Sequence, residues 1–272
     1  MPILAYADDS KALCKNLTGG QLILNAIGTW CDMAHMTISP PKTHVIAFPE
    51  GAVNTLDGRF TYKGHPLEVV PQSRQLGVTF SSASGMGETF AQLRGKMWGA
   101  WDSILHRYGN LRCATSIGVL LKVFLACVVP TASYACESWG WHAIPTTTSG
   151  VTSKTLEKDF LTMLRRIVGV RSTVKTHIFL TELGVVPLRL QWLKRMVTFW
   201  NALVQLAENH LYAQVLRDSC HYGVTSRSSS WVGSFMVAVR SIGYPYLIDC
   251  REPHPIDIVR DSGSSHHQNK CP

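Results

Sequence analysis

The chain has 272 residues, of which 46% are hydrophobic, so it is long enough to fill a sizeable core and is not a disordered or low-complexity protein. Its eight cysteines form no C-x-x-C pair, which argues against a zinc knuckle or a disulfide framework and favours reduced thiols. Residues 81–215 hold 14 Lys and Arg against 7 Asp and Glu, and they supply most of the net charge of +8. This excess suits a phosphate-backbone partner, although a solvated helical face has the same composition.

The first 82 residues have the pattern of a small segment that mixes strands with one helix. Apolar residues at helical spacing from Leu22 to Ala34 predict a helix, which ends before the Ser39-Pro40-Pro41 step. Short runs of β-forming residues bounded by turn residues predict strands at 3–6, 10–14, 44–48 and 75–82, and a hairpin made of 58–63 and 67–70.

From residue 86 onward, helical patterns replace the strands. Apolar residues three and four apart predict helices at 86–107, 112–129, 153–168, 187–208 and 229–242. In the helix at 153–168, one apolar stripe is expected to pack in the core: Leu156, Phe160, Met163, Leu164 and Ile167. The cationic residues Lys158, Arg165 and Arg166 lie largely off this stripe, which predicts a basic outer face.

The apolar run at 117–136 comes closest to the pattern of a membrane span. It contains Lys122 near its middle and Pro130 further on, so a buried helix is favoured and no membrane partner is expected. No signal peptide is visible, because the first ten residues lack a cationic start and reach two acids almost immediately. We therefore expect an intracellular protein of the nucleus or cytoplasm.

These patterns place the chain in the α+β class, with a small sheet region followed by a mainly α-helical region. The expected divisions are a mixed part at 1–82, a helical part at 83–215, an additional helical segment at 216–250 and a tail at 251–272. The tail contains few large apolar residues and is expected to be disordered.

Asp8 and Asp9 follow the apolar run ILAY and stand at a tight turn. Because the chain has ten aspartates, an Asp-Asp step arises by chance in roughly one such chain in three, and the pair alone is weak evidence. A turn brings adjacent acids near one site, whereas a regular strand sends them to opposite faces. Nucleotidyl transfer uses two Mg²⁺ ions, which prefer carboxylate ligands on a rigid support. The pair is therefore either an ordinary hairpin turn or half of a metal site.

Four segments, taken in order, resemble the reverse transcriptases of non-LTR (LINE-type) retrotransposons. AYADD at 5–9 is similar to the polymerase box of that family, and MTISPPKTHVIAF at 36–48 is similar to the following segment with its Lys-Thr step. YKGHPLEVVPQSRQLGVTFSS at 62–82 resembles the primer-positioning hairpin that ends the palm. FLTMLRRIVGV, ELGVVPL and FW, between 160 and 200, resemble the thumb and its continuation. The resemblance implies a partial palm sheet followed by a helical thumb and connection region.

The resemblance also implies roles for the matched residues. Asp8 and Asp9 would be catalytic and would bind Mg²⁺, and Lys42 would protonate or steady the departing pyrophosphate, unless it is an ordinary surface lysine. Tyr6 would line the floor beneath the primer or incoming nucleotide, its alternative being a buried strand aromatic. The remaining nucleic-acid-binding residues would be Leu76 and Gly77 in the hairpin and Lys158, Arg165, Arg166 and Arg171 along the thumb, where they would contact phosphates.

Two departures from the family pattern bear on activity. Ser73, Arg74 and Gln75 precede Leu76, where the family often has an aromatic residue, two further residues and a tyrosine. The first catalytic aspartate and the fingers of the family precede the Asp-Asp turn, yet only seven residues precede Asp8. We therefore expect a fragment of an RNA-directed DNA polymerase that is inactive by itself but binds RNA template with an RNA–DNA or DNA primer duplex. The alternative is a non-catalytic helical interaction or scaffold protein whose acidic turn is ordinary.

Overall fold

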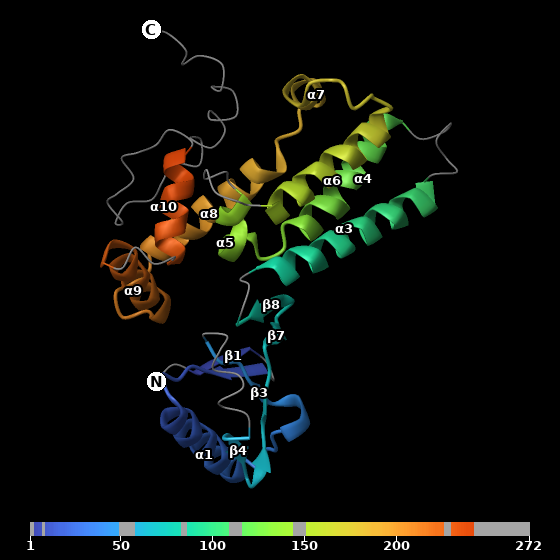
Figure 1. The fold of residues 1–272 in the computed structure, drawn as a ribbon. Coiled ribbons are helices and arrows are strands. Elements are labelled where there is room, and N and C mark those ends of the chain that lie inside the picture. Colours follow the sequence, from blue (N-terminus) through green and yellow to red (C-terminus); the bar gives the residue numbers. More distant parts are fainter. Residues whose placement is uncertain are drawn as a thin grey trace. The chain divides into compact units, whose positions relative to one another are not determined.

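The structure is a computed structural model, and the residues it describes are 3–6, 9–48, 58–82, 86–108, 116–143, 151–225 and 230–241. The chain divides into two compact units, Met1–Thr89 and Phe90–Pro272, and each is described by itself. The first unit combines short strands with one long helix, and the second is helical (Figure 1). This mixture agrees with the expected α+β class.

Within its described residues, the first unit contains four small two-stranded sheets. Two are hairpins whose strands have four residues each: β1 (Ile3–Tyr6) with β2 (Asp9–Ala12), and β7 (Gln72–Gln75) with β8 (Val78–Ser81). The other strands have two residues each: β3 (His44–Val45) runs parallel to β6 (Glu68–Val69), and β4 (Thr61–Tyr62) runs antiparallel to β5 (His65–Pro66). A 3₁₀ turn, η1 (Pro40–Lys42), precedes β3.

One prediction about these strands is wrong and another is confirmed only in part, and both differences involve tight turns. The single strand expected at 75–82 instead reverses direction at Leu76-Gly77, where both residues have positive φ angles, of 46° and 83°. The same kind of turn at Lys63-Gly64 pairs β4 with β5, and the Leu67 N–H donates to Phe60 O at 2.8 Å. The expected hairpin therefore forms, but its second strand begins at His65, and Glu68–Val69 pairs with β3 instead. Positive φ at both central residues matches the twist of a two-residue hairpin, but it is normally signalled by Asn-Gly or Asp-Gly.

The helix of the first unit, α1 (Leu17–Met33), begins earlier than its apolar pattern predicts. Asn16 caps it, because its side-chain Oδ1 accepts a hydrogen bond of 2.8 Å from the backbone N–H of Gly19. The helix lies against β4 through Gly20: a Cβ there would meet Phe60 Cε1 at 2.7 Å. The Gln21 amide also exchanges hydrogen bonds of 2.8 and 3.0 Å with the backbone of Thr61. α1 and β4 therefore form one packed layer over the buried cluster Ala47, Phe60, Tyr62, Leu67 and Val69.

The second unit is built from helices of very different lengths (Figure 1). The long ones are α3 (Gly87–Tyr108, which begins in the first unit), α4 (Ile117–Ala132), α6 (Val151–Val168), α8 (Leu188–Val204), α9 (Leu211–Thr225) and α10 (Trp231–Ser241). The short ones are α5 (Cys136–Trp139), the 3₁₀ helix η4 (Gly140–Ala143) and α7 (Thr176–Leu183). The helices expected near 86–107, 112–129, 153–168, 187–208 and 229–242 are confirmed, whereas α7 and α9 were not predicted.

The core of the second unit is rich in aromatic side chains. Trp139 contacts Phe90 and Trp192, with ring centroids 5.1 Å apart in both pairs. The predicted stripe on α6 is confirmed, because Leu156, Phe160, Met163 and Leu164 are fully buried, although Ile167 is only half-buried. A second cluster joins α8, α9 and α10 around Trp200, Trp231 and Phe235. On α6 itself, Phe160 packs against Phe124 of α4, with ring centroids 5.5 Å apart, so the buried stripe faces inward and the cationic residues Lys158 and Arg166 face outward.

Two further expectations concern the apolar run and the tail. Residues 117–132 of the run at 117–136 form α4, in which Phe124 and Val128 are buried. In the part of the chain that the structure describes, no helix is both long enough and apolar enough to cross a membrane. The tail expected at 251–272 lies outside the described residues.

Candidate nucleic-acid interface

The acidic turn predicted at the start of the chain lies within the β1–β2 hairpin. Tyr6 pairs with Asp9 at the end of the ladder, and Asp8 lies outside the described residues. The side chain of Tyr6 is 68% exposed, so the alternative of a buried strand aromatic is wrong. Asp9 is exposed as well. Both side chains are therefore accessible to a partner.

The donor set for magnesium is incomplete in the described part of the chain. Among these residues, no group of three or more His, Cys, Asp or Glu side chains is placed to hold a metal ion. Asp32, the next acid along the described chain, forms an ion pair with Lys63 instead. Asp9 alone does not fit Mg²⁺, which needs several oxygen ligands, so magnesium binding through Asp8 and Asp9 stays a prediction.

Lys42 is exposed at the last position of η1, directly before β3. Its backbone N–H donates to Ser39 O at 3.1 Å, and this turn holds the Lys-Thr step. Among the described residues, no hydrogen bond or ion pair joins the Lys42 side chain to the β1–β2 hairpin. Its predicted role at the pyrophosphate therefore remains a prediction.

Leu76 and Gly77 form the two-residue turn between β7 and β8. The hairpin is tied to its surroundings at several points. Lys11 on β2 lies over the Phe80 ring, 5.4 Å from its centroid, and His44 on β3 is hydrogen-bonded to Ser73 on β7. At its other end, the Thr89 hydroxyl exchanges 3.0 Å hydrogen bonds with the backbone N–H and C=O of Thr79. The acidic hairpin and the Leu-Gly hairpin are thus neighbours in the first unit.

The four predicted thumb cations lie on α6 and the loop after it, but their surroundings differ. Lys158, Arg166 and Arg171 are exposed, whereas Arg165 is half-buried. The Arg165 Nη2 atom donates to Val174 O at 3.2 Å and to Thr176 Oγ1 at 3.0 Å, and its guanidinium lies 5.4 Å from the Phe179 ring centroid. Arg165 therefore holds the loop between α6 and α7, whereas the other three are available to a partner.

An open depression of about 290 Å³ lies beside the last turn of α6. It is lined by Thr162, Arg165, Arg166, Gly169, Val170 and Ser172. Gly169 ends the helix with a φ of 77°, and its N–H and that of Val170 both donate to Arg165 O. These two N–H groups are therefore used within the helix end, and the charged groups that line the depression are the side chains of Arg165 and Arg166.

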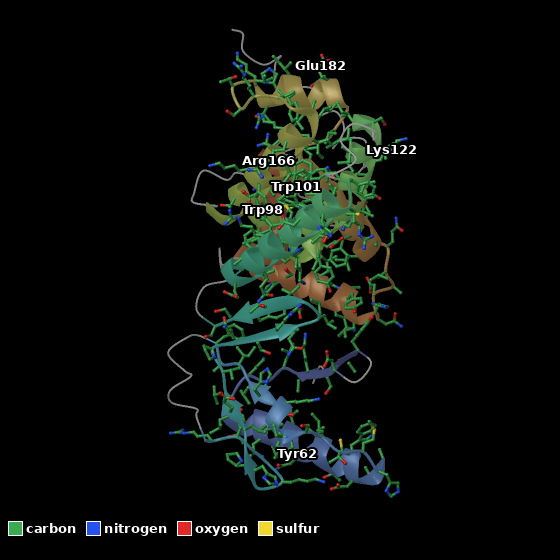
Figure 2. All side chains as sticks on the ribbon, turned by 90° about the vertical axis from the view of Figure 1, so that its right-hand side faces the viewer. Tyr62, Trp98, Trp101, Lys122, Arg166 and Glu182 are labelled. Carbon is green, nitrogen blue, oxygen red and sulfur yellow. The ribbon has the colours of Figure 1, made fainter. Side chains whose placement is uncertain are left out.

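Arg166 lies over an aromatic residue of the neighbouring helix. Its Cζ is 5.8 Å from the centroid of the Trp98 ring on α3, and both side chains are labelled in Figure 2. The Trp98 indole N–H in turn donates to Asp159 Oδ2 at 2.9 Å, and Arg94 Nε donates to the same oxygen at 2.6 Å. The Asp159 carboxylate raises the pKa of Arg94 through this hydrogen bond. The sequence pattern pointed to Arg166 but to none of its three neighbours, Arg94, Trp98 and Asp159.

The missed residues left only weak signals in the sequence. Asp159 is an acid beside the apolar stripe of α6, which suggests a partner inside the fold without naming one. Arg94 and Trp98 are four residues apart on α3, a spacing that places them on one helix face. Neither signal connects α3 to α6.

Glu157 on α6 is a largely buried carboxyl group, and its burial predicts that the stability of the fold depends on pH. Burial raises its pKa, and Arg189, whose Nε is 3.9 Å from Glu157 Oε1, opposes the shift without cancelling it. The unfolded chain loses this proton near the ordinary pKa of 4.5, whereas the folded chain keeps it to a higher pH. The free energy of unfolding therefore falls as the pH rises from 4.5 through the folded-state pKa. We expect Glu157→Gln to raise the melting temperature at pH 7.5 but not at pH 4, measured by circular dichroism.

The exposed Glu182 on α7 provides the matched control for this prediction. Glu182→Gln removes the same charge without relieving a burial cost, so its effect on the melting temperature should be small at both pH values. A lower melting temperature for Glu157→Gln at pH 7.5 would show that the pairing with Arg189 outweighs the burial of the carboxylate.

No protein family model, no curated protein and no solved structure matches the chain.

Proposed function

We propose that the chain is the palm and thumb part of a reverse transcriptase of the non-LTR retrotransposon type, and that it binds an RNA template paired with a primer. The observation that carries this proposal is the basic outer face of α6, where Lys158 and Arg166 are exposed and Arg166 lines an open depression. A row of cations on a rigid helix is the feature that a phosphate backbone recognises without regard to base sequence.

Contacts inside the first unit support the palm part of the proposal. Segments similar to three of the family's boxes contact one another there: Lys11 follows the acidic turn and meets Phe80, and His44 follows the Lys-Thr step and meets Ser73. A palm needs its acidic turn and its primer-positioning hairpin in one body. The side chain of Tyr6 is exposed in that body, as a residue that touches the primer or nucleotide must be.

By itself, the chain is proposed to be inactive as a polymerase. Two-metal catalysis needs a further carboxylate on a strand that adjoins the acidic turn. Within the described residues, β1 and β2 pair only with each other, and no strand that carries an acid lies along their outer edges. Primer extension by residues 1–272 on an RNA template with Mg²⁺ is the direct measurement, and robust synthesis would contradict this part of the proposal.

Binding is tested by fluorescence anisotropy with a labelled RNA–DNA duplex between 50 and 200 mM salt. Each phosphate contact contributes a slope of about −0.9 in log affinity against log salt, so three contacts weaken binding roughly 40-fold over this range. A duplex that binds with no salt dependence, or that does not bind at all, would overturn the proposal.

A second candidate function, a helical interaction or scaffold protein, is favoured by one observation on α1. The outer face of this helix exposes Leu22, Trp30 and Met33, which are 64%, 55% and 70% accessible, while its opposite face is buried. A helix that is apolar on two faces is normally covered on both. This function predicts that Asp8→Asn and Asp9→Asn leave every response to Mg²⁺ unchanged and that nucleic acid does not bind.

A further inference from the structure

Asp159 is the most buried carboxylate among the residues that the structure describes in α6, with 8% of its surface exposed. A buried ionised group is costly unless it is paired and hydrogen-bonded. Its partners are Arg94 Nε at 2.6 Å and Trp98 Nε1 at 2.9 Å, and both donate to the same oxygen, Oδ2. Asp159 thus fixes the position of the Trp98 indole relative to α6.

The Trp98 ring connects Asp159 to Arg166, which is two turns further along the same helix. The Arg166 guanidinium lies over this ring at 5.8 Å, within the range of a cation–π contact (Figure 2). A free arginine side chain has about 2 kcal/mol of rotamer entropy to lose when it binds a ligand. A side chain already held against a ring loses less, which favours binding.

The ordinary role of an arginine at a helix C-terminus explains Arg165 but does not explain Arg166. Arg165 contacts the loop beyond the helix, where it bonds to Val174 O and Thr176 Oγ1. Arg166 instead lies toward α3, over Trp98, and it also lines the depression. Its position therefore serves something other than capping the helix dipole.

We infer that the depression binds one phosphate group of a nucleic-acid backbone through Arg166, and that Asp159 is a positioning residue which acts through Trp98. This inference rests on the proposed function. Ser172 supplies a hydroxyl donor on the loop wall, and Arg165 holds that wall in place. Arg165 and Arg166 both line the depression, and a contact from a guanidinium to a phosphate oxygen carries no information about the base.

The direction in which Asp159→Asn changes the affinity for duplex distinguishes a positioning role of Asp159 from an effect of its charge alone. Asp159→Asn removes a negative charge, so attraction by the overall field would strengthen binding of an RNA–DNA duplex. The positioning role requires the opposite result: Asp159→Asn weakens binding about three- to fivefold at 0.1 M salt, and Trp98→Phe, which keeps the ring but loses the N–H, weakens it in the same direction. Arg166→Gln weakens binding about eightfold, and the salt slope falls in magnitude by about 0.9.

The double variant Asp159→Asn/Arg166→Gln shows whether the carboxylate acts through the arginine. If it does, Asp159→Asn produces no further loss of affinity once Arg166 is gone, whereas damage to the fold would add to it. Melting curves by circular dichroism confirm that each variant is folded at the assay temperature. Arg240→Gln, an exposed arginine on α10, is the matched charge control and leaves the affinity within about twofold.

The outcomes distinguish this inference from the proposed function. If the wild-type chain binds duplex but Asp159→Asn and Trp98→Phe bind as well as it does or better, the positioning role is wrong and the proposed function stands. If Arg166→Gln binds the duplex with the same affinity as Arg240→Gln, the proposed phosphate site at Arg166 is wrong. If the wild-type chain does not bind, both fail.

Discussion

Combined replacement of Lys158, Arg166 and Arg171 by glutamine is expected to weaken binding of an RNA–DNA duplex on the order of 500-fold at 0.1 M salt. Each lost phosphate contact lowers the magnitude of the salt slope by about 0.9, so three contacts remove about 2.7. All three side chains are exposed, and among the described residues none of them makes an ion pair. The fold should therefore survive, and anisotropy titrations over a salt series measure the effect directly.

The control for this prediction removes three positive charges elsewhere in the second unit. Lys122 on α4, Lys194 on α8 and Arg240 on α10 are also exposed, so their joint replacement by glutamine produces the same net charge. We expect this control to weaken binding by less than about tenfold and to leave the slope nearly unchanged. Equal losses in the two triple variants would mean that the overall charge, and not the face of α6, attracts the duplex.

Trp192→Ala is expected to lower the free energy of unfolding of the second unit by about 3–5 kcal/mol, the usual cost of removing a buried tryptophan. Trp192 is fully buried, and its ring meets Trp139 at 5.1 Å. Its indole N–H also donates to Ser133 Oγ at 3.0 Å. The alanine would leave a cavity and an unpaired hydroxyl in the centre of the unit, and urea unfolding followed by far-ultraviolet circular dichroism measures the loss.

Phe199 on the same helix offers a comparison of similar size. It is 40% exposed, so Phe199→Ala removes less buried surface and should cost roughly 1 kcal/mol. A third variant, Trp192→Phe, keeps most of the ring but not the N–H, and its cost should lie between the other two. If Trp192→Ala were no more harmful than Phe199→Ala, the proposed centre of the core would be wrong.

Periodicity predicted the helices of this chain well because burial in a helix follows a local rule. The stripe from Leu156 to Leu164 is the clearest case, since every third or fourth residue had to face inward whatever it packed against. The strands were harder. β3 and β6 pair in parallel although they lie more than twenty residues apart, and no local pattern specifies such a partner. The turn at Leu76 also lacked the asparagine or aspartate that usually signals it.

The charged residues of the candidate interface could be predicted from the sequence, but the contacts that hold their side chains could not. The family resemblance implied that Arg165 and Arg166 both contact phosphate, and nothing in the sequence around these two adjacent residues distinguished one from the other. Only the contacts show that one bonds to the next loop while the other lies on Trp98. The contact between Arg166 and Trp98 joins residues 68 positions apart, and the hydrogen bonds of Asp159 to Trp98 and Arg94 span 61 and 65 positions. Helical periodicity carries no information at such separations.

The glycines of α1 have a mechanical consequence. Gly20 faces the Phe60 ring and Gly28 faces the Tyr62 ring, where a Cβ would come within 3.3 Å of Tyr62 Cε2. Sliding the helix by one turn, about 5.4 Å along its axis, would press Leu24 against an aromatic ring where only a hydrogen atom now fits. The Phe60 and Tyr62 rings therefore allow α1 to pack against β4 at only one position along its axis.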